Sequence, residues 1–213
     1  MSEIAAVILA AGRSTRFVGD RSNATKLIAE LHGKPLVRHV ADAALASTVS
    51  PVIVVTGHAC DAVQDALAGL PLTFVHNKDY ATGLASSLRA GVAAVPQRAS
   101  GAVVLLGDMP LVTADLIDHL IRRFAENPKV DAIVPFTNGR RGNPVLLSGS
   151  LFAAVAGLSA DEGARSLLQT PGVRVFEVPV EGDAASADID TPERLEEWRQ
   201  KQSAGASAGP ATT

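Results

Sequence analysis

The chain has 213 residues and a formal net charge of −3, with 47% hydrophobic and 19% charged residues. This size and composition suit one globular α/β domain, and the acidic balance argues against a broad surface for nucleic acid or anionic membrane. The single cysteine, Cys60, excludes an intramolecular disulfide and a cysteine-based metal cluster. Because no apolar run is long enough to span a membrane and the N-terminus lacks a basic signal region, we expect a cytoplasmic protein.

Short apolar runs alternate with amphipathic stretches along the chain. The apolar runs predict β-strands at Ile4–Ala10, Val52–Thr56, Leu72–His76, Ala102–Gly107, Ala132–Phe136 and Val173–Val178. The amphipathic stretches predict helices at Pro35–Ala46, Ala59–Ala68, Leu84–Val95, Ala114–Glu126 and Pro192–Gln200. Pro35 and Pro192 suit the first turns of their helices, and Thr113 suits the N-cap of the helix that follows it.

The alternation of strands and helices predicts a three-layer, Rossmann-like α/β fold. We expect a mostly parallel sheet with helices on both faces and right-handed crossovers. A further strand over Asn143–Leu147, after the turn at Asn138-Gly139, would be antiparallel to the others. One domain is expected over residues 1–202, and residues 203–213 contain no large apolar side chain and are expected to form a disordered tail.

A basic loop that carries hydroxyl groups follows the first strand directly. The strand ends in the small residues Leu9-Ala10-Ala11-Gly12, and the loop continues through Arg13 and Arg16 to Lys26. Many backbone N–H groups and positive charges after a buried parallel strand predict an anion cradle, which suits a nucleoside triphosphate. The spacing matches neither a P-loop nor the dinucleotide fingerprint GxGxxG. A solvated basic loop is the alternative interpretation.

Acidic residues follow two other segments that could meet this loop. Asp108 stands at the end of an apolar strand, where one carboxylate suits Mg²⁺, although it could also cap the turn that follows. Asp188 and Asp190 point to the same side of an extended segment. Asp190 could instead open a capping box with Glu193. Two separated acids beside a basic loop favour a Mg²⁺ site, to which Mn²⁺ is also suited.

Two further segments could contact a substrate. Asn77, Gly83, Ser86 and Ser87 surround a helix start and could bind a base, a ribose or a phosphate, although a plain capped helix has the same pattern. The turn Gly139–Asn143 holds Arg140 and Arg141 between glycines. Arginine binds phosphate and carboxylate well, but a surface turn is the default interpretation. The histidines show no metal-ligand spacing; they are His32, His39, His58, His76 and His119.

The ordered set of LAAG-x-S-x-R, Lys26, GKPLVRHV, LGDMPLV and DIDTPE resembles the MobA-like nucleotidyltransferases over about Ala5 to Trp198. LAAG in place of LAGG, together with Pro35–Val40, makes it most similar to the molybdenum cofactor cytidylyltransferases. The stretch Asn77–Gly91 resembles the family's N-x₅-G-L-x-x-S-L-x-x-G segment, and Asp161–Arg165 resembles its D-x-G-A-R segment. Two features depart from the family pattern: the loop over residues 17–25 is longer, and Asn143 stands where the family commonly has His.

The resemblance implies that the terminal phosphate of a molybdopterin-type cofactor attacks the α-phosphorus of CTP and releases pyrophosphate. It implies catalytic roles for Arg16, Lys26 and Asp108, and a metal held by Asp108 and Asp190. Substrate contacts are implied for Leu9, Ala10, Ala11, Gly12, Asn77, Gly83, Ser86, Ser87, Arg141 and Asn143. A molybdoenzyme or its maturation chaperone is an expected partner, and nucleic acid and membrane are not.

Two other functions stay open on the sequence. The chain could be a related nucleotidyltransferase that uses GTP, or one whose acceptor is a sugar phosphate or polyol phosphate. It could also be a non-catalytic nucleotide-binding protein. The paired acids Asp108 and Asp190 argue against the last interpretation, because binding alone needs no positioned metal.

Overall fold

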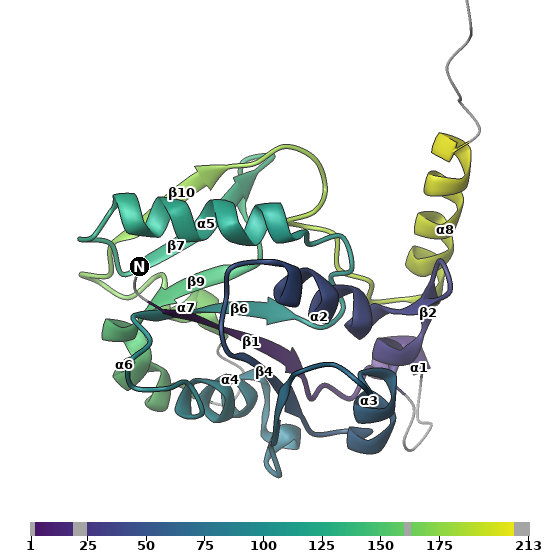
Figure 1. Cartoon of the computed structure of the whole chain (residues 1–213), viewed down its shortest axis with the longest axis horizontal. Helices are drawn as coiled ribbons and strands as arrows, with labels where there is room; N and C mark the ends of the chain where they lie inside the picture. Colours follow the sequence, from purple (N-terminus) through teal and green to yellow (C-terminus); the bar gives the residue numbers. More distant parts are fainter. Residues whose placement is uncertain (1–2, 19–24, 160–162, 207–213) are drawn as a thin grey trace, which may run out of the picture.

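A mixed sheet runs through the computed structural model, which describes residues 3–18, 25–159 and 163–206 (Figure 1). The eight-stranded sheet has the order β10-β7-β9-β6-β1-β4-β5, with β8 paired to β7. Its strands are β1 (Ile4–Ala10), β4 (Val52–Thr56), β5 (Thr73–His76), β6 (Gly101–Leu106), β7 (Ala132–Thr137), β8 (Arg140–Arg141), β9 (Val145–Ser148) and β10 (Val175–Pro179). The short strands β2 (Glu30–Leu31) and β3 (Lys34–Pro35) form a separate antiparallel pair.

Most neighbouring strands of the large sheet are parallel. Strand β1 pairs in parallel with both β4 and β6, and β10 pairs in parallel with β7. Strand β9 is antiparallel to β6 and β7, as the sequence predicted for this stretch. The carboxyl ends of β1, β4 and β6 therefore meet at one edge of the sheet, which is where open α/β sheets bind their ligands.

Helices cover both faces of the sheet, which confirms the predicted three-layer fold (Figure 1). Strand β1 is buried along its whole length, and alternate residues such as Ile8 and Val7 enter different core clusters. The helices are α1 (Thr15–Val18), α2 (Leu36–Ala46), α3 (Cys60–Ala66), α4 (Leu84–Ala93), α5 (Ala114–Glu126), α6 (Phe152–Ala156), α7 (Ala164–Leu167) and α8 (Pro192–Ala206). Helices α2, α3 and α5 contribute to one cluster, and α4, α6 and α7 contribute to the other.

A third, smaller core lies beside the two main ones. Leu195 and Trp198 of α8 pack there with Leu31 of β2, and Ile189 joins them from the segment before the helix. In Figure 1, α8 stands at the edge of the molecule next to β2. This packing anchors the segment that carries Asp188 and Asp190. None of the helices in the described part of the chain is long and apolar enough to cross a membrane.

The predicted bounds differ from the observed ones by at most two residues, except at the end of α8. Pro35 is the residue before α2 and pairs within β3, so it is not in the helix's first turn. Helix α8 continues to Ala206, into the stretch expected to be a tail. The rest of the predicted tail, residues 207–213, lies outside the described residues.

Candidate active site

A cleft of about 650 Å³ opens at the carboxyl ends of β1 and β6. The first loop, the residues after β6, the start of α4 and the segment before α8 all contribute to its wall. The lining residues are Leu9, Ala11, Gly12, Arg13, Ser14, Thr15, Arg16, Lys26, Leu27, Tyr80, Ala81, Gly83, Leu84, Ser87, Leu106, Asp108, Asp188 and Asp190. The basic loop and the acids that the sequence singled out therefore share one cleft.

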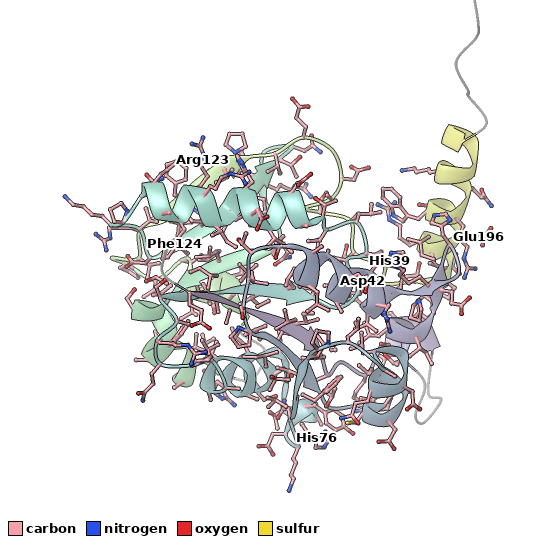
Figure 2. The ribbon with its side chains drawn as sticks, viewed as in Figure 1. His39, Asp42, His76, Arg123, Phe124 and Glu196 are labelled. Atoms are coloured by element: carbon pink, nitrogen blue, oxygen red, sulfur yellow. The ribbon has the colours of Figure 1, made fainter. Side chains whose placement is uncertain are left out.

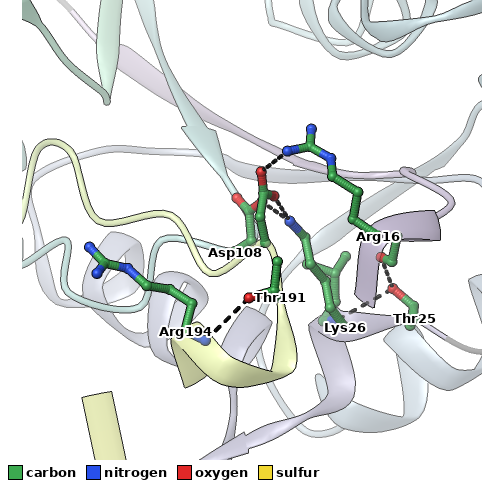
Figure 3. A network of polar contacts seen from close by, with 9 residues as sticks. Arg16, Thr25, Lys26, Asp108, Thr191 and Arg194 are labelled. Atoms are coloured by element: carbon green, nitrogen blue, oxygen red, sulfur yellow. Dashed lines mark hydrogen bonds and ion pairs between the residues drawn. The ribbon is translucent and has the colours of Figure 1, made fainter. Parts of the chain in front are cut away.

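Lys26 is the centre of the charged part of this cleft (Figure 3). Its Nζ lies 2.6 Å from Oδ2 of Asp108 and also forms an ion pair with Oδ1 of Asp190. Arg16 Nη1 lies 2.6 Å from Oδ2 of Asp190. The Lys26 and Asp108 side chains are only 12% and 17% exposed, so water screens their attraction weakly. Two cations and two carboxylates thus form one continuous network.

The network shifts the pKa values of Lys26 and Asp190. Burial by itself would lower the pKa of the Lys26 ammonium, but the charges and hydrogen bonds of Asp108 and Asp190 raise it above its usual value. Burial would raise the pKa of the Asp190 carboxyl, yet the hydrogen bond and charge of Lys26 and the charge of Arg16 lower it. Lys26 and Asp190 are therefore charged at neutral pH.

Backbone contacts bring the two acidic segments together. Gly107 N donates to Leu9 O at 3.0 Å, which fixes the residues after β6 against the end of β1. Ile189 N donates to the backbone oxygen of Asp108 at 3.1 Å, so the segment before α8 is tied to the same place. The alternative interpretation of Asp190, as the residue that caps the following helix, does not hold: Thr191 Oγ1 caps α8 by accepting from Arg194 N at 3.2 Å (Figure 3). The Asp190 carboxylate is left for Lys26 and Arg16.

The long first loop still delivers Lys26 to the carboxylates. Lys26 begins the short 3-10 helix η1 (Lys26–Ile28), and its neighbour Leu27 is buried. A Cβ on Gly107 would lie 3.3 Å from Leu27 Cδ2, so the residue after Lys26 packs directly against the residue before Asp108. Of residues 17–25, the loop expected to be longer than in the family, residues 19–24 lie outside the described residues.

Only part of the predicted Asn77–Ser87 group lines the cleft. Gly83 and Ser87 do, and Gly83 has a φ of 112°, a left-handed value that glycine adopts without strain. Asn77 is buried, and its Nδ2 donates to Ser86 Oγ at 2.8 Å and to Ser87 Oγ at 3.1 Å. Asn77 and Ser86 therefore support the start of α4 (Leu84–Ala93). Among the first-strand residues, Leu9, Ala11 and Gly12 line the cleft, whereas Ala10 is buried outside its lining.

Arg141 and Asn143 are not in this cleft. Arg141 Nε donates to Glu177 Oε1 at 2.7 Å, which joins β8 to β10. The residue lines a second cavity of about 320 Å³ with Thr137, Asn138, Arg140, Gly142 and Ser186. Asn143 N donates to Ala185 O at 2.8 Å and does not line either cavity in the described part of the chain. Ser186 of this cavity and Asp188 of the cleft are two residues apart, so one segment borders both.

The cleft also contains residues that the sequence did not single out as ligands. One wall of the cleft, near the end of β4, is apolar. It is formed by Tyr80, in the 3-10 helix η2 (Tyr80–Thr82), and by Leu84, which is 45% exposed. The tyrosine ring lies 5.9 Å from the ring of His58. The only sequence signal for Tyr80 was that it is the single tyrosine of the chain. Gly163 of the predicted DEGAR segment adjoins Leu84, whereas Asp161 and Glu162 lie outside the described residues.

The motif over Pro35–Val40 does not line the cleft. His39 Nε2 lies 2.9 Å from Leu31 O, and Arg38 donates to Ala68 O at 3.0 Å. Figure 2 shows His39 on α2 beside β2, close to Asp42, whose carboxylate accepts from Lys34. These side chains hold α2 against its neighbours, so they do not touch a ligand in the cleft.

The carboxylates fit a divalent cation. Asp108 and Asp190 both reach the same ammonium group, so both can reach one small cation in the same place. Across the described residues there is no group of three or more His, Cys, Asp and Glu side chains that could hold a metal ion. Two protein carboxylates suit Mg²⁺ or Mn²⁺, which complete their coordination with water and substrate phosphate oxygens.

Comparison with known proteins identifies the family. The model of the MobA-like NTP transferase domain matches residues 6–175. The chain belongs to this family. The bifunctional protein GlmU of Syntrophotalea carbinolica is 30% identical over 194 residues, which cover 86% of this chain and 40% of that protein. The chain therefore spans less than half the length of this curated relative.

Solved structures of the same fold cover nearly the whole chain. Rv0371c from Mycobacterium tuberculosis H37Rv is 28% identical, with a TM-score of 0.81 over 93% of this chain and 98% of that one. A manganese complex of Rv0371c has a TM-score of 0.75 at 27% identity over the same shares of both chains. Molybdopterin-guanine dinucleotide biosynthesis protein A from Archaeoglobus fulgidus has a TM-score of 0.70 at 18% identity over 94% of this chain and 100% of that one, a likeness of fold alone. The predicted nucleotidyltransferase-type fold is thus confirmed.

Proposed function

We propose that this family member transfers CMP from CTP to the terminal phosphate of a molybdopterin-type cofactor and releases pyrophosphate. The supporting observation is the network of Lys26, Arg16, Asp108 and Asp190 at the end of a cleft whose other wall, around Tyr80 and Leu84, is largely apolar. The charged part suits a triphosphate and its metal, and the apolar part suits a nucleobase.

In the proposed reaction, an oxygen of the acceptor phosphate attacks the α-phosphorus of CTP. The bond from that phosphorus to the oxygen shared with the β-phosphate breaks, and its electron pair leaves with pyrophosphate. The attacking phosphate is already anionic, so alignment and charge neutralisation carry the catalysis. Arg16 and Lys26 would hold the triphosphate, and Lys26 would exchange its carboxylate partners for phosphate oxygens. A Mg²⁺ or Mn²⁺ ion held by Asp108 and Asp190 would supply Lewis-acid stabilisation.

The acceptor would be recognised next to the cleft, at the second cavity. Its lining consists of polar residues and glycine, including the guanidinium groups of Arg140 and Arg141. Arginine is suited to phosphate and carboxylate groups of a bound pterin cofactor. A molybdoenzyme or its maturation chaperone would then receive the nucleotide-bearing product.

GTP is the second candidate nucleotide. The Pro35–Val40 run, one of the two motifs that favour CTP, makes structural hydrogen bonds away from the cleft. Base selection therefore depends on the residues that line the cleft, such as Ala11 and Gly83.

Pyrophosphate release tests the proposal. Purified protein is incubated with CTP or GTP and Mg²⁺ or Mn²⁺, and with molybdenum cofactor or a set of sugar and polyol phosphates as acceptors. We expect release with CTP and molybdenum cofactor, and release about 10³-fold slower in the Asp108→Ala variant. Release only with GTP or only with a sugar phosphate would replace the substrates proposed here. Binding of nucleotide without release from any acceptor would support a non-catalytic binding protein.

A further inference from the structure

Ser14 and Thr25 stand at the two ends of the stretch that contains Arg16 and leads to Lys26. Ser14 Oγ and Thr25 Oγ1 lie 3.1 Å apart, a hydrogen bond between residues eleven positions apart in the chain. Ser14 has a left-handed backbone with a φ of 54°, and its carbonyl oxygen accepts from Phe17 N at 2.9 Å. Because Phe17 lies in α1 (Thr15–Val18), Ser14 is fixed to the helix that carries Arg16.

Thr25 makes a second hydrogen bond on the other side of the same hydroxyl. Its Oγ1 accepts from Leu27 N at 3.3 Å and so caps η1, the short helix that begins with Lys26. A threonine hydroxyl has one donor hydrogen and two acceptor lone pairs, so it can accept from Leu27 N and also bond to Ser14 Oγ. Thr25 is 3% exposed, which protects these bonds from competition with water. One hydroxyl therefore joins the start of the loop to the helix that holds Lys26.

The two ends of the loop converge on one carboxylate. Arg16 and Lys26 pair with different oxygens of Asp190, and Lys26 also reaches Asp108. A long lysine side chain loses rotamer entropy when it is held in one place, and a mobile backbone would add to that cost. The Ser14–Thr25 contact and the burial of Leu27 fix the backbone on both sides of Lys26.

We propose that Thr25 is a positioning residue: through its hydrogen bonds to Ser14 and to η1, it holds Lys26 at the Asp108 and Asp190 carboxylates, ready for the triphosphate. The use of Lys26 by a triphosphate rests on the function proposed above. The placement of Lys26 by Thr25 does not depend on it.

A cap that only stabilises the fold would have different consequences, and the chain offers a matched control. Thr113 caps α5 by the same kind of bond, since its Oγ1 accepts from Leu116 N at 3.2 Å. Thr113 does not line the cleft. The variants Thr25→Val and Thr113→Val each remove one capping hydroxyl with little change in side-chain shape. Thr25→Ser retains the hydroxyl.

Chemical labelling of lysine in the ligand-free full chain tests the placement directly. The acetylation rate of Lys26 is measured by mass spectrometry, with the 44% exposed Lys34 as the internal reference. In Thr25→Val, which removes both hydrogen bonds of this hydroxyl, we expect Lys26 to react about fivefold faster or more, since the loss of the capping bond alone corresponds to that factor. Ser14→Ala should act in the same direction. Thr25→Ser and Thr113→Val should leave the Lys26 rate at the wild-type value.

Nucleotide kinetics give a second readout. Thr25→Val should lower kcat/KM for the nucleotide about fivefold or more, and Thr25→Ser should restore it. An unchanged Lys26 labelling rate in folded Thr25→Val, or an equal increase in Thr113→Val, would overturn the positioning role. If the wild-type chain releases pyrophosphate from no nucleotide, the proposed function fails, while the labelling still decides what Thr25 does.

Discussion

The first loop, which leads to Lys26, and the turn over Gly139–Asn143 look alike in the sequence, because both place arginine between glycines. In the structure they differ in their partners. Lys26 and Arg16 pair with Asp108 and Asp190, which belong to two other segments and could hold a metal. Arg141 pairs with Glu177 of β10 (Val175–Pro179), a strand that, like β8, pairs with β7, so its side chain joins two strands of the sheet.

The difference follows from where each segment leaves the sheet. The first loop leaves β1 (Ile4–Ala10), whose carboxyl end lies beside those of β4 and β6. The turn over Gly139–Asn143 contains β8, which follows β7 after Asn138 and Gly139 and pairs with it as an antiparallel hairpin. Basic residues near glycine thus indicate a candidate anion site only when the topology brings carboxylates of other segments and cleft walls to the same place.

The largest expected effect comes from Asp108. Asp108→Ala should lower kcat by about 10³-fold, because it removes one of the two carboxylates that would hold the metal ion at the phosphates. The fold should stay intact, since the Ile189 N bond goes to the backbone oxygen of residue 108. Pyrophosphate release and circular dichroism measure the two properties. Activity like that of the wild type in this variant would contradict the proposed metal role.

Lys26→Met should lower kcat/KM for the nucleotide by about 10²-fold, since the methylene stem is kept and only the charge is lost. The same change should tighten Mn²⁺ binding in the absence of nucleotide, because the ammonium no longer competes for both carboxylates. Calorimetric titration with MnCl₂ measures this binding. Weaker binding of Mn²⁺ to the variant would argue that the carboxylates do not form the metal site.

Gly142→Ala tests whether a change in the turn over Gly139–Asn143 reaches the cleft through the backbone. A Cβ at this position would collide with the carbonyl oxygen of Ala185, in the segment that continues to Asp188 and Asp190. We expect a loss of about 1–3 kcal/mol in the free energy of unfolding and about a tenfold decrease in kcat/KM. Urea unfolding and steady-state kinetics measure the two effects. A loss of stability without any loss of activity would show that the turn and the cleft are independent.

The stability contributed by Asp190 should depend on pH. Its pKa is lower in the folded than in the unfolded chain, so the folded state holds its proton less tightly. The contribution is therefore full above the ordinary value of 3.8 and is lost as the pH falls through the lower folded pKa. Urea unfolding of wild type and Asp190→Asn should differ by about 1 kcal/mol or less at pH 6, and less still at pH 3. A stability difference between the two proteins that grows on acidification would contradict a lowered pKa of Asp190 in the folded state.

The smallest expected effect on nucleotide use is that of Arg141→Leu. The nucleotide KM should change by less than about threefold, because this guanidinium pairs with Glu177 away from the cleft. The KM for the acceptor should rise if the second cavity recognises it. A large rise in nucleotide KM with unchanged acceptor KM would place Arg141 in the nucleotide site after all.

Much of the site could be predicted from local pattern. The apolar run into Leu9–Gly12 and the acid after the buried strand β6 (Gly101–Leu106) are visible in the sequence, because strand ends and small-residue turns have local signatures. Asn77, Arg141 and Asn143 have the right chemistry but lie outside the cleft. Their partners, Ser86 and Ser87, Glu177 and Ala185, are set by tertiary contacts that no local pattern encodes.

The sequence alone determined the layered α/β fold, the strand that begins it and the types of residue that meet at its edge, since hydrophobic periodicity is a local property. Only the tertiary structure decided which of these residues meet. Lys26 reaches its carboxylates because Thr25 bonds to Ser14 and Leu27 packs against Gly107. Asp190 is available because Thr191 takes the capping role. Such choices depend on competition between neighbouring side chains in space, which spacing along the chain cannot decide.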